Sequence, residues 1–387
     1  MSHRRSKLLD LLFSAPGYQA AKLPYQDSGT TDIEPFPFLA IVGQREMKLA
    51  LMLALINPAI GGVLLVGSRG TAKTTAVRSL IDLLPTMTVS LCPNGNGCTE
   101  AVVEQEGMDG ICLDCATRFG YGEPLSKEEK VRIVELPLNS RLEDVVGGID
   151  ERAMIEKNQV RLSRGLLARS DQNVLYIDEV NLLEKNIADA ILDAAAQGHY
   201  TVWRGPQKLS YRSRFVLIGS MNPEEGSLRP QIMDRFGLRV VLHGLADKEE
   251  RLEVYQRTRQ YRDNPPAFVS GYAEQTLAMA DEIQRARQIL PSVTLSQEAL
   301  DLGLSFVQIL RIESNRAEFT LFEAARAYAA AADRDVANAS DVAAIARMAL
   351  RLRQGYGMQD FVRLLESDEE MLGKTLDKML PVDEEEE

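Results

Sequence analysis

Between residues 36 and 246, short aliphatic runs alternate with stretches whose apolar positions recur at helical spacing. Four runs rich in β-branched and aliphatic residues predict buried strands, at 63–66, 173–177, 215–218 and 238–242. Helical periodicity predicts the helices that separate them, at 46–56, 74–84 and 187–195. Strands that alternate with helices are typical of βαβ units. We therefore predict an α/β fold with a parallel sheet in a three-layer αβα sandwich, over 36–246.

Two further patterns set the remaining boundaries. Polar–apolar alternation on both sides of Gly205-Pro206 predicts a β-hairpin inserted at about 198–214. Beyond about residue 247 the strand signal disappears, and long helical segments predict an all-α linker and lid domain over 247–355. The flanking segments are predicted to be an N-terminal arm (1–35) and an acidic C-terminal tail (356–387).

The composition is that of an ordinary globular protein, because 45% of the 387 residues are hydrophobic and 26% are charged. The sequence has no apolar run of about 18 residues and no signal-peptide core, so we expect a cytoplasmic protein without a membrane span. The net charge is −12, of which residues 366–387, with ten acidic residues and two lysines, contribute −8. This tail is either a solvated end or a docking segment for a basic partner. The remaining body, at about −4, lacks the basic footprint of a nucleic-acid-binding protein.

A phosphate-binding loop follows the first predicted strand and opens a helix, which is the context that this motif requires. Its residues are Gly67, Ser68, Arg69, Gly70, Thr71, Ala72, Lys73 and Thr74, with Thr75 next in the helix. We expect Lys73 to reach the terminal phosphates of ATP and Thr74 to place its hydroxyl on Mg²⁺. Ala72 stands where glycine is usual, and we expect the loop to close with a negative φ there. A generic Gly/Ala turn is the alternative.

Polar residues follow the next two strands of the predicted sheet. An acid at the end of a buried strand beside a phosphate loop can coordinate Mg²⁺ or its water shell, and a neighbouring acid can polarise the attacking water. We assign the first role to Asp178 and the second to Glu179; a solvated strand-end pair is the alternative. Asn222, beyond the third strand, is expected to orient the attacking water. Together with the loop, these residues predict an ATPase.

Two arginines, Arg229 and Arg235, lie on a short helix predicted at 228–236. Planar guanidinium groups suit the charge that develops during phosphoryl transfer, and a neighbouring subunit can supply such a group. From the residues alone, a surface salt bridge is the simpler interpretation of Arg235.

The order of these motifs resembles the AAA+ ATPase subunit of magnesium chelatase, the motor of the enzyme that inserts Mg²⁺ into protoporphyrin IX. The resemblance covers about residues 36–350 and implies a P-loop core with β-hairpin insertions and a helical lid. Besides the phosphate loop it rests on Phe36-Pro37-Phe38, Ile41-Val42-Gly43-Gln44, Ile177-Asp178-Glu179-Val180-Asn181-Leu182-Leu183, Asn222-Pro223-Glu224-Glu225-Gly226, Leu228-Arg229-Pro230-Gln231 and Asp234-Arg235-Phe236-Gly237.

The resemblance also implies roles for individual residues. Four of them would border the adenine: Ile41, Val42, Gly43 and Gln44. Asn222 would be the first sensor, and Arg235 the finger that reaches a neighbouring subunit's site, with Arg229 as a second contact of that kind. Arg316 stands in the place of the second sensor and would contact the γ-phosphate across the lid; a structural arginine is the alternative. The insertions at 137–166 and 198–214 would engage partners.

All four cysteines lie in an insertion at about 90–120: Cys92, Cys98, Cys112 and Cys115. Clustered cysteines in a cytosolic protein indicate a metal site before disulfides, and Cys-x₂-Cys is a common half-site for tetrahedral zinc. We predict a structural Zn²⁺ that braces a loop, because four thiolates leave no open coordination position. Reduced free thiols and a redox disulfide are the alternatives. Related cobalt-chelatase ATPases often carry cysteines here, which leaves the choice between Mg²⁺ and Co²⁺ as substrate open.

The resemblance implies a ring-forming ATPase, expected to be a hexamer, that drives metal insertion into a tetrapyrrole by a separate chelatase subunit, as in chlorophyll biosynthesis. The implied partners are further copies of the chain, an AAA+/von Willebrand factor A domain subunit and a large tetrapyrrole-binding subunit. The chain itself offers no tetrapyrrole site, since its three histidines are scattered. The alternative is a MoxR-type remodelling chaperone with a von Willebrand factor A partner. A nucleic-acid motor is disfavoured by the acidic balance.

Overall fold

The structure, a computed structural model, describes Leu8, Leu9, Leu12 and residues 34–92, 97–148, 163–204, 207–353 and 370–374. Most of the predicted N-terminal arm and most of the acidic tail lie outside these residues. So do the turn at Gly205-Pro206 and much of the predicted insertion at 137–166.

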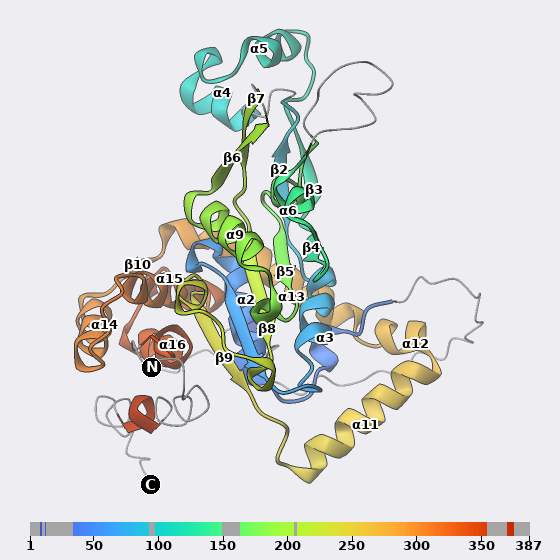
Figure 1. The fold of residues 1–387 in the computed structure, drawn as a ribbon, viewed down its shortest axis with the longest axis vertical. Coiled ribbons are helices and arrows are strands. Elements are labelled where there is room, and N and C mark those ends of the chain that lie inside the picture. The colour runs from blue at the N-terminus through green and yellow to red at the C-terminus, as the bar shows by residue number, and fades with distance from the viewer. Residues whose placement is uncertain are drawn as a thin grey trace.

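A parallel sheet, five-stranded within the described residues, forms the centre of the core (Figure 1). In spatial order its strands are β4 (Ile133–Leu136), β5 (Val174–Ile177), β8 (Val216–Met221), β1 (Val63–Gly67) and β9 (Leu238–Leu242). Four of them were predicted, although β8 runs to Met221 instead of 218. The edge strand β4 was missed because Glu135 interrupts a run of only four residues. All neighbouring strands in this sheet are parallel, as expected.

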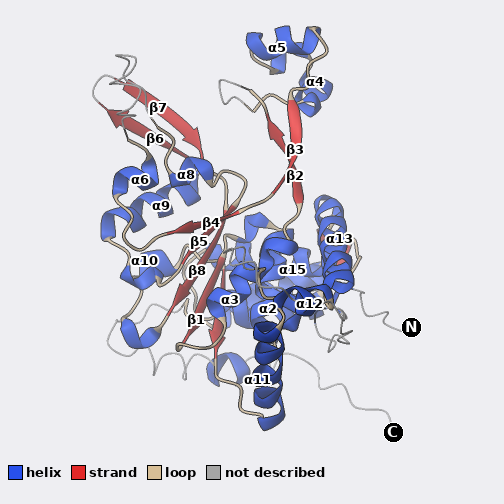
Figure 2. Cartoon of the chain, turned by 90° about the vertical axis from the view of Figure 1, so that its right-hand side faces the viewer, coloured by secondary structure: helices blue, strands red, loops and turns tan. Residues whose placement is uncertain are grey.

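Alternate residues of each strand enter two separate hydrophobic cores. Val63 and Leu65 of β1 belong to one core, with α2 (Arg45–Ile56) and helices of the lid. Leu64 and Val66 belong to the other, with α9 (Lys185–Gln197). Because successive strand side chains point to opposite faces, helices cover both sides of the sheet (Figure 2). The predicted three-layer sandwich is therefore confirmed.

Several helices of the core are short. The helix after the phosphate loop, α3 (Lys73–Arg78), gives way to a 3₁₀ turn at Ser79–Asp82, so the predicted helix at 74–84 was too long. At that point the Ser79 hydroxyl donates to the Thr75 carbonyl oxygen (2.6 Å), a bond that competes with the regular helix. The other short helices are α6 (Leu142–Val146), α8 (Leu166–Arg169) and α10 (Pro230–Met233).

Two antiparallel hairpins project from one end of the core (Figures 1 and 2). The hairpin of β6 (His199–Arg204) and β7 (Gln207–Arg212) matches the predicted insertion. The hairpin of β2 (Thr86–Ser90) and β3 (Ser126–Lys130) was not predicted, because β3 contains only polar residues. This second hairpin carries the cysteines together with α4 (Glu100–Glu106) and α5 (Leu113–Gly120).

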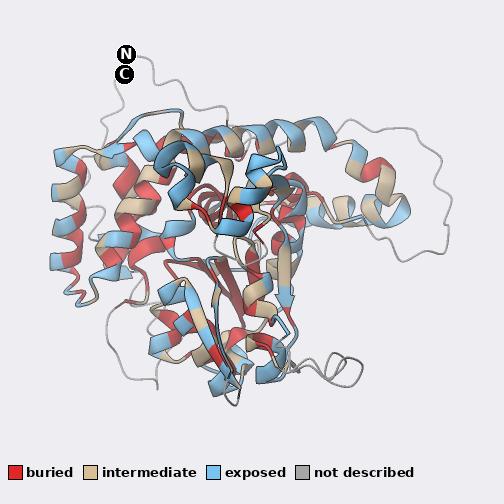
Figure 3. Ribbon diagram, turned by 90° about the horizontal axis from the view of Figure 1, so that it is seen from above, coloured by how far each residue is buried: buried red, intermediate tan, exposed pale blue. Residues whose placement is uncertain are grey.

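The lid packs its helices against the first of the two cores, and buried residues gather where these helices meet the sheet layer (Figure 3). Its helices are α11 (Lys248–Asp263), α12 (Pro265–Ser270), α13 (Ala273–Ile289), α14 (Gln297–Ile309), α15 (Arg316–Ala331) and α16 (Ala339–Leu350). The prediction of an all-α lid was wrong in one detail. β10 (Thr294–Leu295) pairs in parallel with β11 (Val336–Ala337), and strands of two residues leave no detectable period in a sequence.

Candidate nucleotide site and cysteine cluster

The phosphate loop turns the chain from the end of β1 into α3. Ala72, immediately before the helix, has φ of +65° and ψ of +20°. The expected negative φ at Ala72 was therefore wrong, because the loop requires a left-handed residue at this point. An L-residue in that conformation costs about 1–2 kcal/mol, a cost that glycine avoids. Gly70 also has a positive φ, of +82°.

Lys73 lies folded across this loop. Its Nζ donates to the carbonyl oxygens of Gly67 (2.6 Å) and Ser68 (2.8 Å). Burial lowers the pKa of Lys73, and the carboxylates of Asp178 and Glu225 partly oppose that effect. The loop thus holds a cation. The anionic oxygens of a ligand could replace the two carbonyl oxygens that this cation contacts.

Hydroxyl groups surround the Asp178 carboxylate at the end of β5. The Thr74 hydroxyl donates to Oδ2 (3.1 Å) and the Tyr176 hydroxyl to Oδ1 (2.9 Å), while the Ser220 hydroxyl also donates to Oδ1. Desolvation by itself would raise the pKa of Asp178, but the hydrogen bonds from Ser220, Tyr176 and Thr74 hold it below its ordinary value. An ionised carboxylate and a threonine hydroxyl, both hard oxygen groups, fit the preferences of Mg²⁺.

Tyr176 and Ser220 were missed in the sequence, although a signal existed. Tyr176 precedes Asp178 by two residues and therefore lies on the same side of β5. Ser220 lies on the neighbouring strand, where Ile177 is level with Gly219. Only the strand order, which the sequence does not display, makes Ser220 a neighbour of Asp178.

Glu179 and Asn222 lie in the same neighbourhood. Glu179 has a positive φ (+52°), and its backbone N–H donates to the Ser220 hydroxyl (3.1 Å). Asn222 is buried, and its Oδ1 accepts from the N–H of Glu224 (3.2 Å). The next residue, Glu225, forms an ion pair with Arg69 (2.5 Å) and so joins the Asn222 turn to the phosphate loop. This contact was not predicted.

A cavity of about 640 Å³ opens beside the phosphate loop. Ile41, Val42 and Gln44, which the resemblance assigns to the adenine, line it together with Gly70, Thr71, Ala72 and Thr75. Gly43 is not part of the lining. It has a positive φ, and a Cβ there would lie 2.8 Å from the Leu245 side chain. The opposite wall is α11, through Arg251, Val254, Tyr255, Thr258 and Arg262. This wall was missed because α11 is strongly polar and has no buried residue.

The three candidate arginines do not line this cavity. Arg235 follows α10 instead of lying on it, because the helix ends at Met233. It is half-buried and forms no ion pair with the residues that the structure describes; desolvation and, next, the nearby Arg316 lower its pKa. Arg316 forms an ion pair with Asp234 (3.6 Å), so it meets the core beside Arg235. Arg229 forms an ion pair with Asp189 of α9 (3.3 Å).

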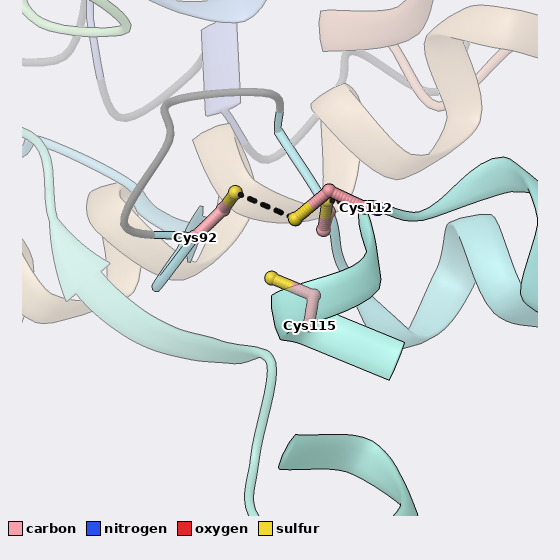
Figure 4. Close-up of side chains that lie close together, drawn as sticks. Cys92, Cys112 and Cys115 are labelled. Carbon is pink, nitrogen blue, oxygen red and sulfur yellow. Dashed lines mark hydrogen bonds between the residues drawn. The ribbon is translucent and has the colours of Figure 1, made fainter. Parts of the chain in front are cut away.

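The four cysteines converge at the end of the β2–β3 hairpin, and Figure 4 shows how Cys92, Cys112 and Cys115 lie. Their Sγ atoms all lie within 4.8 Å of one another, and those of Cys92 and Cys112 are 3.6 Å apart. The N–H of Cys112 donates to the Cys98 sulfur (3.3 Å). Tetrahedral zinc with Zn–S bonds of about 2.3 Å separates its sulfurs by about 3.8 Å. The donor set and its spacing therefore fit a zinc ion after a small contraction.

Comparison with known proteins identifies the family. A model described as magnesium chelatase, subunit ChlI, matches residues 145–236, and an AAA lid domain matches residues 308–371. The chain is 41% identical over 321 residues to the magnesium-chelatase subunit ChlI homolog of Methanocaldococcus jannaschii, covering 81% of this chain and 84% of that one. The chain belongs to the magnesium-chelatase subunit ChlI family. It is also 39% identical to the magnesium-chelatase 38 kDa subunit of Acidiphilium rubrum, covering 82% of this chain and 90% of that one.

The resemblance inferred from the motifs is thus confirmed, and this ChlI-family chain is an AAA+ ATPase. A putative ATPase from Cytophaga hutchinsonii shares its fold, with a TM-score of 0.55 at 18% identity over 89% of this chain and 92% of that one. The comparisons give no support to the MoxR-type alternative. No helix in the described ranges combines the length and the apolar character that crossing a bilayer would need.

Proposed function

We propose that this ChlI-family chain is the ATP-driven motor of a magnesium chelatase. In this proposal copies of the chain assemble into a ring in the cytoplasm, and ATP turnover drives insertion of Mg²⁺ into a tetrapyrrole held by a separate large subunit. An AAA+/von Willebrand factor A domain subunit completes the enzyme. The observation that carries the proposal is the phosphate loop, in which the Thr74 hydroxyl donates a hydrogen bond to the Asp178 carboxylate. It occurs in a chain that is 41% identical to a magnesium-chelatase subunit ChlI homolog.

The nucleotide chemistry is assigned to residues that surround the loop. Lys73 binds the terminal phosphates, and Thr74 with Asp178 holds the Mg²⁺ of Mg-ATP, which supplies charge neutralisation when it is bound. Glu179 accepts a proton from the attacking water, and Asn222 orients that water. The cavity between Ile41, Val42, Gln44 and α11 receives the adenosine.

Arginines from a neighbouring copy complete the site. Support comes from Arg235, which is half-buried without an ion pair among the described residues and does not line its own chain's cavity. Arg316 lies beside it, and Arg229 precedes the same short helix. An arginine supplied in trans can accelerate phosphoryl transfer by about 10³–10⁵. We therefore assign Arg235 to the neighbour's γ-phosphate, with Arg229 as a second contact across the interface and Arg316 as the second sensor, which contacts the γ-phosphate across the lid.

The cysteine cluster holds a structural Zn²⁺. Three of its four thiols are buried in a cluster that contains little else apolar besides Ile111 and Leu125. So small a core cannot stabilise the unit by burial alone, and zinc bound by four thiolates supplies the missing folding free energy.

Reconstitution tests the proposed function. The protein is added with Mg²⁺, ATP and protoporphyrin IX to the other two subunits of a magnesium chelatase, and the fluorescence of the metallated product is followed. The expected result is product formation that requires ATP and disappears with Glu179→Gln protein; a parallel reaction with Co²⁺ identifies the substrate metal. Normal ATP turnover without metal insertion, whichever metal is supplied, would contradict the proposal.

A further inference from the structure

A second cavity, of about 950 Å³, lies between the two projecting hairpins and is distinct from the nucleotide site. One wall is formed by β2 and the end of β3, and another by Leu209, Ser210, Tyr211 and Arg212 of β7. Its remaining walls come from β4 and from residues 164–173. We call it the hairpin cleft.

Basic side chains dominate the hairpin cleft. Its lining includes Lys130, Arg132, Arg164, Arg169 and Arg212. The acidic residues of the lining are Glu129 and Asp171, so the formal balance is 5 − 2 = +3. The net charge of the whole chain is −12, so this cleft is a local region of positive charge. Such a region attracts anionic partners.

Most of this positive charge is not neutralised within the chain. Arg132 forms an ion pair with Glu129, and Arg212 lies 3.8 Å from Asp171. Lys130, Arg164 and Arg169 form no ion pair with any residue that the structure describes, and both of these arginines are exposed. Three cations are thus available to a ligand.

The shape of the cleft favours an extended polypeptide. β4 is the edge strand of the large sheet, and β2 and β7 each pair on one side only within the described residues. Four consecutive residues of β7 line the cleft, so its backbone as well as its side chains borders the opening. Edge strands offer unpaired N–H and C=O groups to an added peptide, and cations beside them select for acidic side chains.

We propose that the hairpin cleft binds the acidic C-terminal segment 376–387 of a second copy of the chain. This segment ends in Asp383-Glu384-Glu385-Glu386-Glu387, which matches the charge of the cleft. The inference rests on one part of the proposed function, namely that copies of the chain assemble.

The location of the lid explains why the segment comes from another copy. Leu372, in the last described stretch of chain, is buried in the core that the lid shares, and Gly373 lies close to Arg347 of α16. That stretch and the cysteine-bearing hairpin lie at opposite ends of the long axis of the molecule (Figure 1). The described residues to which the acidic segment is joined therefore lie far from the cleft of their own chain. Between copies, the same contact would tie the lid of one to the insertions of the next.

A peptide-binding experiment tests this inference without ATP or tetrapyrrole, so its failure is distinguishable from failure of the proposed motor function. The probe is a fluorescein-labelled peptide of residues 376–387. The receptor is full-length protein whose own tail is neutralised by Glu384→Gln, Glu385→Gln, Glu386→Gln and Glu387→Gln. Fluorescence anisotropy should show saturable binding that weakens as salt is raised from about 50 to 200 mM, because added salt screens the charges.

Charge reversal locates the site. Adding Arg164→Glu and Arg169→Glu to the receptor should weaken binding by about tenfold or more. The control receptor carries Arg259→Glu and Arg285→Glu, which make the same change in net charge at exposed positions of α11 and α13, and should bind like the parent. Equal weakening in both receptors would overturn the inference. The inference would also be overturned if a peptide with glutamine in place of every glutamate bound as tightly as the acidic peptide. Displacement of the acidic peptide by inorganic phosphate at micromolar concentration would overturn it too.

Discussion

Replacing Asp234 with asparagine should loosen the lid from the core while leaving the nucleotide cavity intact. The Asp234 carboxylate lies between the α/β core and the lid. Its Oδ1 accepts from the Ser314 hydroxyl (3.1 Å) and forms an ion pair with Arg353 (3.3 Å), and its Oδ2 forms an ion pair with Arg316 (3.6 Å). Asparagine keeps the shape of the side chain, removes its negative charge and replaces one acceptor oxygen with a donor amide group.

The magnitude follows from Arg353, whose side chain is 1% exposed. Desolvation lowers the pKa of Arg353 to about 10, although the Asp234 carboxylate opposes that effect. Breaking a buried ion pair typically costs about 3–5 kcal/mol because a buried charge is left behind. Asp234 itself is 38% exposed, and Arg353 also donates to the carbonyl oxygens of Gly237 and Ala349. We therefore expect a loss of about 2–3 kcal/mol at this contact.

Hydrogen exchange measured by mass spectrometry reports the opening of this region directly. A loss of 2–3 kcal/mol should reduce the protection of α16 roughly 30- to 150-fold, while amides of β1 and β8 change much less. Adding Arg353→Met should restore part of the protection, because the buried cation that pairs most closely with Asp234 is then removed as well. The control is Asp263→Asn, which removes an exposed partner of Arg259 and should change protection less than about twofold. If Asp234→Asn behaves like this control, the carboxylate does not hold the lid.

Three further predictions concern the two candidate sites. Lys73→Ala should abolish tight ATP binding, whereas Glu179→Gln should bind fluorescent ATP normally and lose turnover; hydrolysis at the parent rate by the glutamine variant would show that Glu179 is not the base. Tyr176→Phe removes a hydrogen bond to the ionised Asp178, so the pKa of Asp178 should rise. The loss of ATPase activity on acidification should then begin at a higher pH than in the parent, and an unchanged acid limb of the pH–rate profile would contradict the role of Tyr176. Cys112→Ser should release one zinc ion per chain, detected by elemental analysis of protein purified without chelators, and leave ATP binding intact; four reactive thiols and no zinc in the parent would refute the metal site.

Much of the core could be predicted because its strands are buried on both faces. Continuous aliphatic runs such as 63–66 have few alternatives to a central strand, and the polar residues that follow them collect at one edge of a parallel sheet. For that reason Asp178 could be placed beside the phosphate loop before its distance to Thr74 was known.

The features that were missed depend on pairing between distant segments. The polar strand β3 is a strand only because β2 lies beside it, and Ser220 becomes a neighbour of Asp178 only through the strand order. The left-handed Ala72 departs from local preference because the turn between β1 and α3 requires that conformation. The α11 wall of the nucleotide cavity escaped detection because this strongly polar helix has no buried residue that would mark one of its faces.

The claim that a neighbour completes each nucleotide site is tested most directly by mixing two inactive proteins. Arg235→Ala protein keeps its own phosphate loop and Glu179 but donates no finger, whereas Glu179→Gln protein donates a finger and lacks the base. Steady-state ATP hydrolysis is measured across mixing ratios, with assembly checked by light scattering. We expect activity to reappear and to be greatest at intermediate ratios, because mixed interfaces join an intact site to an intact Arg235. Assembled mixtures that stay inactive at every ratio would contradict this claim.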